Sequence, residues 1–198
     1  MVETPSGPAA ITLDRPAGRV RGLLMLGHGA SGGVDAVDLV AVRDATLAVG
    51  LAVARMTQPY RVAGKRMPPA STVLDAAWIA AVTQVRRTVG ARLPLVLGGR
   101  SSGARVACRT AAELKAAGVL ALAFPLHPPG RPASSRAGEL DPARPTLIIN
   151  GDRDTFGVPE PTGLVQVVVR PGETHALRKD PSGVAAVAAD WLRELLGL

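Results

Sequence analysis

Short apolar runs alternate with longer amphipathic stretches along most of the chain. Six apolar runs have the length of strands: residues 20–29, 51–58, 93–99, 119–126, 145–151 and 164–172. Four stretches carry apolar residues at helical spacing: residues 34–50, 68–90, 102–118 and 180–198. Runs that are apolar throughout predict strands buried on both faces, and intervening helices predict parallel crossovers. We therefore expect an α/β fold with a mostly parallel central sheet and helices on both faces.

Polar and small residues mark the expected helix ends. Ser71 or Thr72 is the expected N-cap of helix 68–90, and Asp180 or Ser182 that of the closing helix. Gly118 is expected to end helix 102–118. The segment 127–144 is rich in Pro, Gly and Ser and is too short for a separate folded lid.

Composition narrows the class of protein. The 198 residues predict a single domain over 1–198, with 47% apolar residues for its core. One cysteine, Cys108, excludes an internal disulfide and fits a reducing compartment. No apolar run reaches the roughly 18–20 residues that span a bilayer, and the N-terminus lacks the pattern of a secretory signal. We expect a cytoplasmic protein with no membrane contact.

The net charge of +7 raises the question of an anionic partner such as nucleic acid. The arginines are scattered rather than clustered, and aromatic residues make up only 3% of the chain. A basic surface without a nucleic-acid partner is therefore the favoured interpretation.

The chemistry-bearing motif is Gly-Arg-Ser-Ser-Gly at residues 99–103, between a predicted strand and a predicted helix. A Gly-x-Ser-x-Gly sequence in this position is typical of a nucleophile elbow, in which a strained turn exposes the serine hydroxyl at the sheet edge. Gly99 and Gly103 leave room for the close strand-to-helix approach. The alternative is that Ser101 only caps the helix.

A nucleophilic serine needs a histidine base and an acid that orients it. Of the three histidines, only His175 follows the last predicted strand, where the base is expected, because the order is Ser, acid, His. The loop after strand 145–151 offers two acids. We favour Asp154, and expect Asp152 to hold the loop by hydrogen bonds to backbone, but the choice stays open.

The expected oxyanion hole combines the amide of Ser102 with one from the loop "LGHGASGG" at 26–33, where Ala30 is the candidate. His28 in this loop is expected to shape it. The same loop holds a competing signal, because Gly27, Gly29 and Gly32 form a Gly-x-Gly-x-x-Gly pattern typical of NADP-binding Rossmann proteins. Arg55 could then meet a 2′-phosphate.

Several segments together resemble one known family. "LGHGASGG", "QPYRVAGKRMPP", "GGRSSGAR", "FPLHPPGRP", "INGDRDTFG" and "HALR" are similar to short, lidless α/β-hydrolases of the dienelactone-hydrolase-like group, from about residue 20 to the C-terminus. That branch includes a testis-expressed protein and the hydrolase-like domain of an NSL-complex regulatory subunit. The resemblance implies the α/β-hydrolase fold without a lid domain, and a triad of Ser101, Asp154 and His175. The chain departs at Ser102, where a larger apolar residue such as Met is typical.

The predicted function is hydrolysis of an ester or thioester of a small molecule through an acyl-enzyme, with no cofactor and no metal. Residues 58–69 are expected to form part of the rim, where Arg61, Lys65 and Arg66 could favour an acidic acyl group, although a solvated loop is the preferred interpretation. A second class of hypothesis is a binding module that has this fold but does not use the site.

Overall fold

The computed structural model describes residues 1–141 and 143–198. Its strands are β1 (Ala10–Asp14), β2 (Gly22–Gly27), β3 (Leu51–Thr57), β4 (Leu95–Arg100), β5 (Gly118–Leu122), β6 (Thr146–Gly151) and β7 (Val165–Arg170). Its helices are α1 (Val37–Ala48), α2 (Pro59–Val62), α3 (Ser71–Val89), α4 (Ser102–Thr110) and α5 (Pro181–Leu196), with the 3₁₀ turn η1 (Ala137–Glu139). The six predicted strands and four long helices are all present, and most of their ends are shifted by only a few residues.

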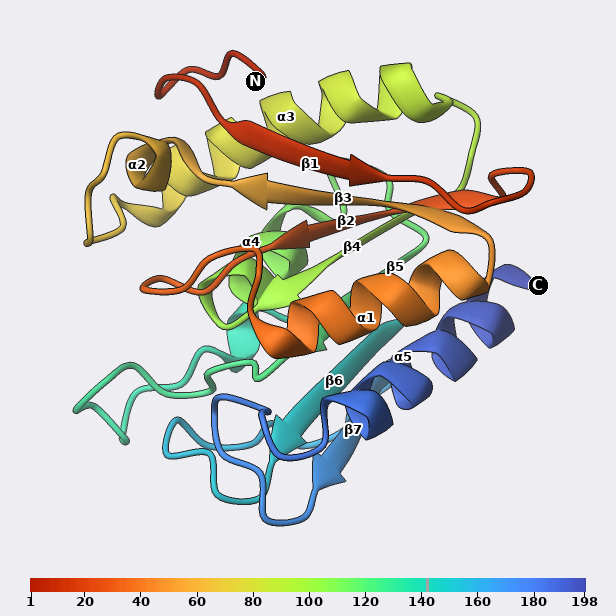
Figure 1. Ribbon diagram of the computed structural model, residues 1–198. Coiled ribbons are helices and arrows are strands. Elements are labelled where there is room, and N and C mark those ends of the chain that lie inside the picture. The colour runs from red at the N-terminus through yellow and green to blue at the C-terminus, as the bar shows by residue number, and fades with distance from the viewer. Residues whose placement is uncertain (142) are drawn as a thin grey trace.

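One sheet carries all seven strands in the order β1-β3-β2-β4-β5-β6-β7. Strands β2 to β7 run parallel, and only β1 pairs antiparallel, at the edge beside β3 (Figure 1). This is the expected α/β-hydrolase fold. Because strands β2 to β7 are parallel, their carboxyl ends lie at one edge, where ligands bind in open α/β sheets.

Two layers of helices cover the sheet. Successive residues of β2 alternate between them: Leu23 and Met25 pack in the core beneath α3 and α4, and Leu24 and Leu26 in the core beneath α1 and α5. Helices α1 and α5 lie side by side on one face of the sheet (Figure 1). This double burial explains why the strands are apolar without alternation.

Sequence patterns missed or misplaced several local features. Strand β1 was not predicted, because its five residues are only half-buried and lack a continuous apolar run. Helix α2 is a single turn, too short for periodicity to show. Helix α3 begins at Ser71 with Ala70 as N-cap, so the prediction that Ser71 or Thr72 caps it is wrong. In contrast, Asp180 does cap α5, accepting from the Gly183 amide at 2.8 Å.

Helix α4 also ends earlier than predicted, at Thr110 rather than near Gly118. The chain turns through Lys115, which has a left-handed φ of 51°, and Gly118 already belongs to β5.

Among the described residues of segment 127–144, η1 is the only helical element. Over residues 1–141 and 143–198, no helix has the length and apolar character needed to cross a bilayer.

Candidate active site

Ser101 lies on a strained turn between β4 and α4. Its φ of 54° and ψ of −109° are unfavourable for a residue with a side chain, and the fold holds them by a hydrogen bond from the Ser101 amide to the Leu122 carbonyl at 2.9 Å. A strained non-glycine residue between a strand and a helix is what the elbow motif predicts. Ser101 occupies the N-cap position of α4, but its side chain makes no capping hydrogen bond, so capping alone does not explain the residue.

Small residues let α4 approach the sheet at this turn. A Cβ atom on Gly99 or Gly103 would collide with the backbone of Gly27 at the end of β2. Gly27 therefore serves close packing between β2 and α4. Gly27, the first glycine of the dinucleotide pattern, thus has a structural explanation in this fold.

His175 joins Ser101 to Asp154. Its Nε2 lies 2.9 Å from the Ser101 hydroxyl oxygen, and its Nδ1 lies 2.8 Å from a carboxylate oxygen of Asp154. Because an ionised carboxylate only accepts hydrogen bonds, Nδ1 carries the ring proton and Nε2 accepts from the serine hydroxyl. The ring of Phe156 packs edge-on against the imidazole, with centroids 4.5 Å apart.

The two candidate acids lie in different surroundings. The side chain of Asp154 is fully buried, and its second oxygen accepts from the Phe156 amide at 2.9 Å. Asp152 is exposed and accepts from the Gly172 amide at 2.7 Å, so it links two loops without contacting His175. Of the two, the structure brings Asp154 to the histidine.

The candidate oxyanion donors, Ala30 and Ser102, both line the cavity at Ser101. Ser102 is the first residue of α4, where amides have no partner within the helix. The carbonyl oxygen of Ala30 accepts from the Tyr60 hydroxyl at 2.7 Å, which tethers the residue that carries the candidate amide donor. Tyr60 was not singled out from the sequence, because its contact with Ala30 spans 30 positions of the chain.

His28 and His127 make other contacts. The Nδ1–H of His28 donates to the Gly29 carbonyl at 2.7 Å, and its Nε2 accepts from the Gln58 amide at 3.1 Å. Burial lowers the pKa of His28, which keeps this ring neutral. His127 bonds the Ser134 carbonyl at 2.7 Å. Both histidines therefore hold loops, as expected for His28.

Arg100, which sequence reasoning passed over, tethers the histidine loop. Its guanidinium donates to the His175 carbonyl at 2.9 Å and lies 3.1 Å from the buried carboxylate of Asp38 in α1. Burial raises the pKa of Asp38, and the charge of Arg100 opposes that shift. The residue before the serine thus links α1 to the loop that carries the base.

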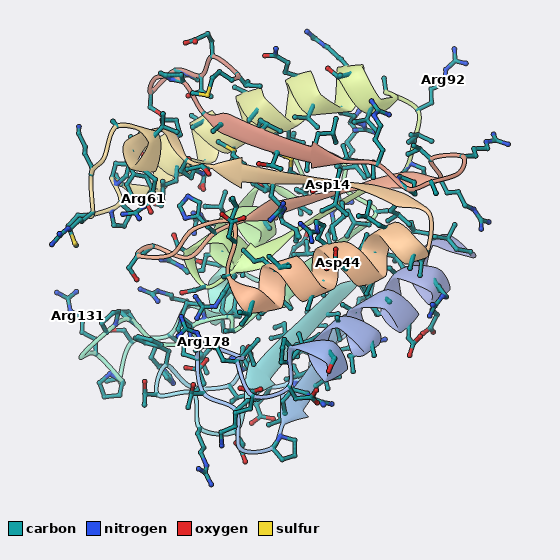
Figure 2. The ribbon with its side chains drawn as sticks, viewed as in Figure 1. Asp14, Asp44, Arg61, Arg92, Arg131 and Arg178 are labelled. Carbon is teal, nitrogen blue, oxygen red and sulfur yellow. The ribbon has the colours of Figure 1, made fainter. Side chains whose placement is uncertain are left out.

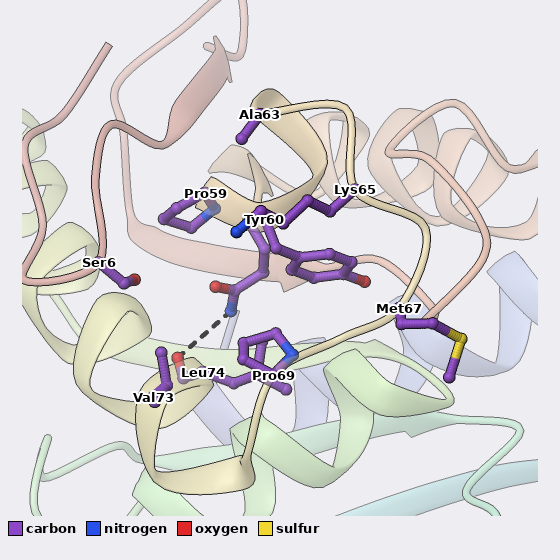
Figure 3. Close-up of a pocket in the computed structure, with 10 residues that line it drawn as sticks. Ser6, Pro59, Tyr60, Ala63, Lys65, Met67, Pro69, Val73 and Leu74 are labelled. Atoms are coloured by element: carbon purple, nitrogen blue, oxygen red, sulfur yellow. Dashed lines mark hydrogen bonds between the residues drawn. The ribbon is translucent and has the colours of Figure 1, made fainter.

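The predicted rim segment 58–69 divides between two cavities. Arg66, Met67 and Pro68 line the one at Ser101, with a volume of about 420 Å³. Tyr60, Lys65 and Met67 line a second cavity of about 340 Å³, beside α2 and the start of α3 (Figure 3). The expectation of a rim therefore holds for the last part of the segment.

The alternative of a dinucleotide site finds no support. Helix α1 begins only at Val37, beyond the glycine pattern, so its N-terminus does not follow the loop directly. Arg55 is 4% exposed, donates to the Val34 carbonyl and contacts Asp14 and Asp35, so the prediction of a 2′-phosphate contact is wrong.

Cys108 is buried, and burial raises the pKa of its thiol to about 12, which excludes it as the nucleophile.

Solved structures share this architecture. A serine hydrolase homologue from Coxiella burnetii is 20% identical, with a TM-score of 0.77 over 96% of this chain and 94% of that one. A serine hydrolase without a lid from Xanthomonas campestris is 21% identical, with a TM-score of 0.81 over 100% and 94%. Est1E from Butyrivibrio proteoclasticus, solved with ferulic acid bound, is 17% identical, with a TM-score of 0.80 over 96% of both chains. These likenesses show the fold.

No curated protein matches the sequence. A family model described as an alpha/beta hydrolase domain matches residues 20–169, from the first parallel strand to the end of the last. That range contains the serine turn, both candidate acids and most of the sheet, and it covers well over half of the sequence. The chain therefore belongs to the α/β-hydrolase domain family.

Proposed function

We propose that this protein is a serine hydrolase that cleaves a carboxylic ester or thioester of a small to medium-sized substrate. The observation that carries the proposal is the chain of hydrogen bonds from the Ser101 hydroxyl through His175 to the buried carboxylate of Asp154. It supports the function because it combines a nucleophile, a base and an orienting acid at the mouth of a cavity.

In the proposed reaction, the Ser101 oxygen attacks the acyl carbonyl as His175 takes its proton. The amides of Ala30 and Ser102 stabilise the negative charge on the carbonyl oxygen. His175 then gives its proton to the leaving alcohol or thiol, and Asp154 stabilises the charged imidazole. Water, activated by the same histidine, releases the acid and restores Ser101.

Within the family, we place the chain in the short, lidless dienelactone-hydrolase-like branch. The support is the set of motifs along the sequence, from "LGHGASGG" to "HALR". We further infer a cytoplasmic location from the lone, buried cysteine, because extracellular domains of this size commonly carry disulfides.

A fluorophosphonate probe followed by peptide mapping tests the proposal. We expect the label on Ser101 alone, and loss of both labelling and p-nitrophenyl ester hydrolysis in Ser101→Ala. Ser134→Ala, in the exposed part of segment 127–144, is the matched control and retains both. Labelling at Ser31 or Ser102 would contradict the assignment, and no labelling of a folded protein would favour the binding-module hypothesis.

A further inference from the structure

The cavity at Ser101 has an unusual electrostatic character. Four arginines line it: Arg66, Arg100, Arg105 and Arg136. Among the described residues that line this cavity, none carries a carboxylate. The remaining wall is largely apolar, formed by Met67, Pro68, Pro125, Pro129 and Phe156. The cavity therefore joins cationic groups to a surface that suits a short carbon chain.

Two of these cations are already paired. Arg100 faces the buried carboxylate of Asp38 at 3.1 Å. Arg105 binds Glu139 through two nitrogens, with Nε at 2.8 Å from the carboxylate. Glu139 is shared with Arg109, whose other partner is Asp75. These contacts hold the guanidinium groups of Arg100 and Arg105 in place. Because Glu139 pairs with both Arg105 and Arg109, little of its negative charge is left for another cation.

Arg136, which is half-buried, differs from Arg100 and Arg105. Its Nη1 donates to the carbonyls of Pro125 and His127, at 3.3 and 3.2 Å, which aims the guanidinium from the loop into the cavity wall. In the described parts of the chain, no carboxylate lies within 4.0 Å of it. Burial and the nearby charge of Arg105 lower the pKa of Arg136, and the charge of Glu139 opposes this shift only in part.

We propose that the Ser101 cavity selects substrates that carry a carboxylate in addition to the ester or thioester bond, with Arg136 as the main contact and Arg66 at the entrance. The guanidinium fork matches a carboxylate in bidentate geometry, and such charge-assisted hydrogen bonds are stronger than those between neutral groups. This inference rests on the proposed hydrolase function and adds the substrate class.

Matched pairs of esters test the proposed preference for a carboxylate. The rate without enzyme is subtracted from each measured rate. The acyl-side pair is mono-p-nitrophenyl adipate and p-nitrophenyl hexanoate, and the alcohol-side pair is 4-acetoxybenzoate and phenyl acetate. We expect kcat/KM to favour the acidic member of at least one pair by about tenfold or more, the effect of roughly one charge-assisted hydrogen bond. Raised salt should reduce the preference, because it screens the charges.

Variants locate the contact. Arg136→Gln should remove most of the preference, and Arg136→Lys should restore part of it, because the charge returns without the fork. Arg66→Gln, in an exposed loop, should reduce the preference by a smaller factor without disturbing the fold. Arg131→Gln is the control. Arg131 lies in the segment that carries Arg136 but extends away from the molecule (Figure 2), so this variant should leave the preference unchanged.

A binding measurement separates this inference from the hydrolase proposal. Calorimetry should detect monomethyl adipate binding to Ser101→Ala, and no binding when Arg136→Gln is added. If both esters of each pair are hydrolysed equally through Ser101 and monomethyl adipate does not bind, the carboxylate inference is wrong and the hydrolase stands. If no ester is hydrolysed but Arg136-dependent binding is found, the hydrolase proposal is wrong and the anion site stands.

Discussion

Asp152 and Asp154 are two positions apart, yet only Asp154 bonds His175, at 2.8 Å. We predict that Asp154→Asn lowers kcat by about 10⁴-fold, because an amide at this position favours the wrong histidine tautomer. Asp152→Asn should instead cost about 1 kcal/mol or less of folding free energy, through its bond to the Gly172 amide. Steady-state kinetics and thermal denaturation of both variants check this, and the reverse ranking would move the acid to Asp152.

The Tyr60 hydroxyl provides a second test at the residue scale, because it holds the carbonyl of Ala30 at 2.7 Å. We predict that Tyr60→Phe lowers kcat by about 3- to 10-fold, the effect of one hydrogen bond of about 0.5–1.5 kcal/mol, with little change in KM. The loss should fall on kcat because the Ala30 amide acts only as charge develops on the substrate oxygen. A variant with lower thermal stability but normal kcat would show that the hydroxyl is purely structural.

His28 predicts a pH dependence of stability. Burial lowers its pKa below the ordinary 6.5, so between these two values the unfolded chain binds a proton that the folded protein does not. Stability from this group is therefore present above pH 6.5 and is lost as the pH falls towards the folded pKa. We expect the melting temperature to decrease from pH 7.5 to 5.5 in the wild type and to decrease less in His28→Gln. Equal decreases in both proteins would contradict this.

At the scale of elements, the approach of α4 to β2 depends on Gly103. A Cβ atom there would collide with the backbone of Gly27, which cannot rotate away as a side chain could. We predict that Gly103→Ala destabilises the protein by roughly 1–3 kcal/mol, a decrease of about 2–4 °C in melting temperature per kcal/mol. Gly18→Ala is the matched control, because a Cβ at Gly18 meets no atom within 4 Å. An unaltered melting temperature in Gly103→Ala would show that this packing is loose.

The predictability of an element depended on how much of its environment is local. Strands β2 to β7 and the four long helices follow from apolar runs and periodicity, because burial on both faces leaves that pattern. Strand β1 is half-buried at the sheet edge, and helix α2 is a single turn. Both are held by neighbours that are distant in the sequence, so their own residues carry little signal.

At the scale of the whole molecule, we expect an open site, because the described residues of segment 127–144 form no long helix that could cover it. The described residues of segment 127–144 contain only η1 and turns, where a lipase-type lid would require a helical insertion. An open site buries little of a long acyl chain, at about 25 cal/mol for each Å² of apolar surface. We therefore predict that kcat/KM for p-nitrophenyl esters peaks at short acyl chains, with no activation at a lipid interface. A rise towards long chains, or a jump above the micellar concentration, would reveal an acyl groove.

The sequence alone determined the α/β architecture, the serine turn and the position of a histidine after the last parallel strand. These follow from burial patterns and chain order, which are local or one-dimensional properties. Only the tertiary structure decided that Asp154 contacts His175, that Tyr60 bonds the Ala30 carbonyl, and that Arg136 faces the same cavity as Ser101. Such contacts join segments far apart in the chain, and they depend on the twist and register of the sheet, which no short stretch of residues encodes.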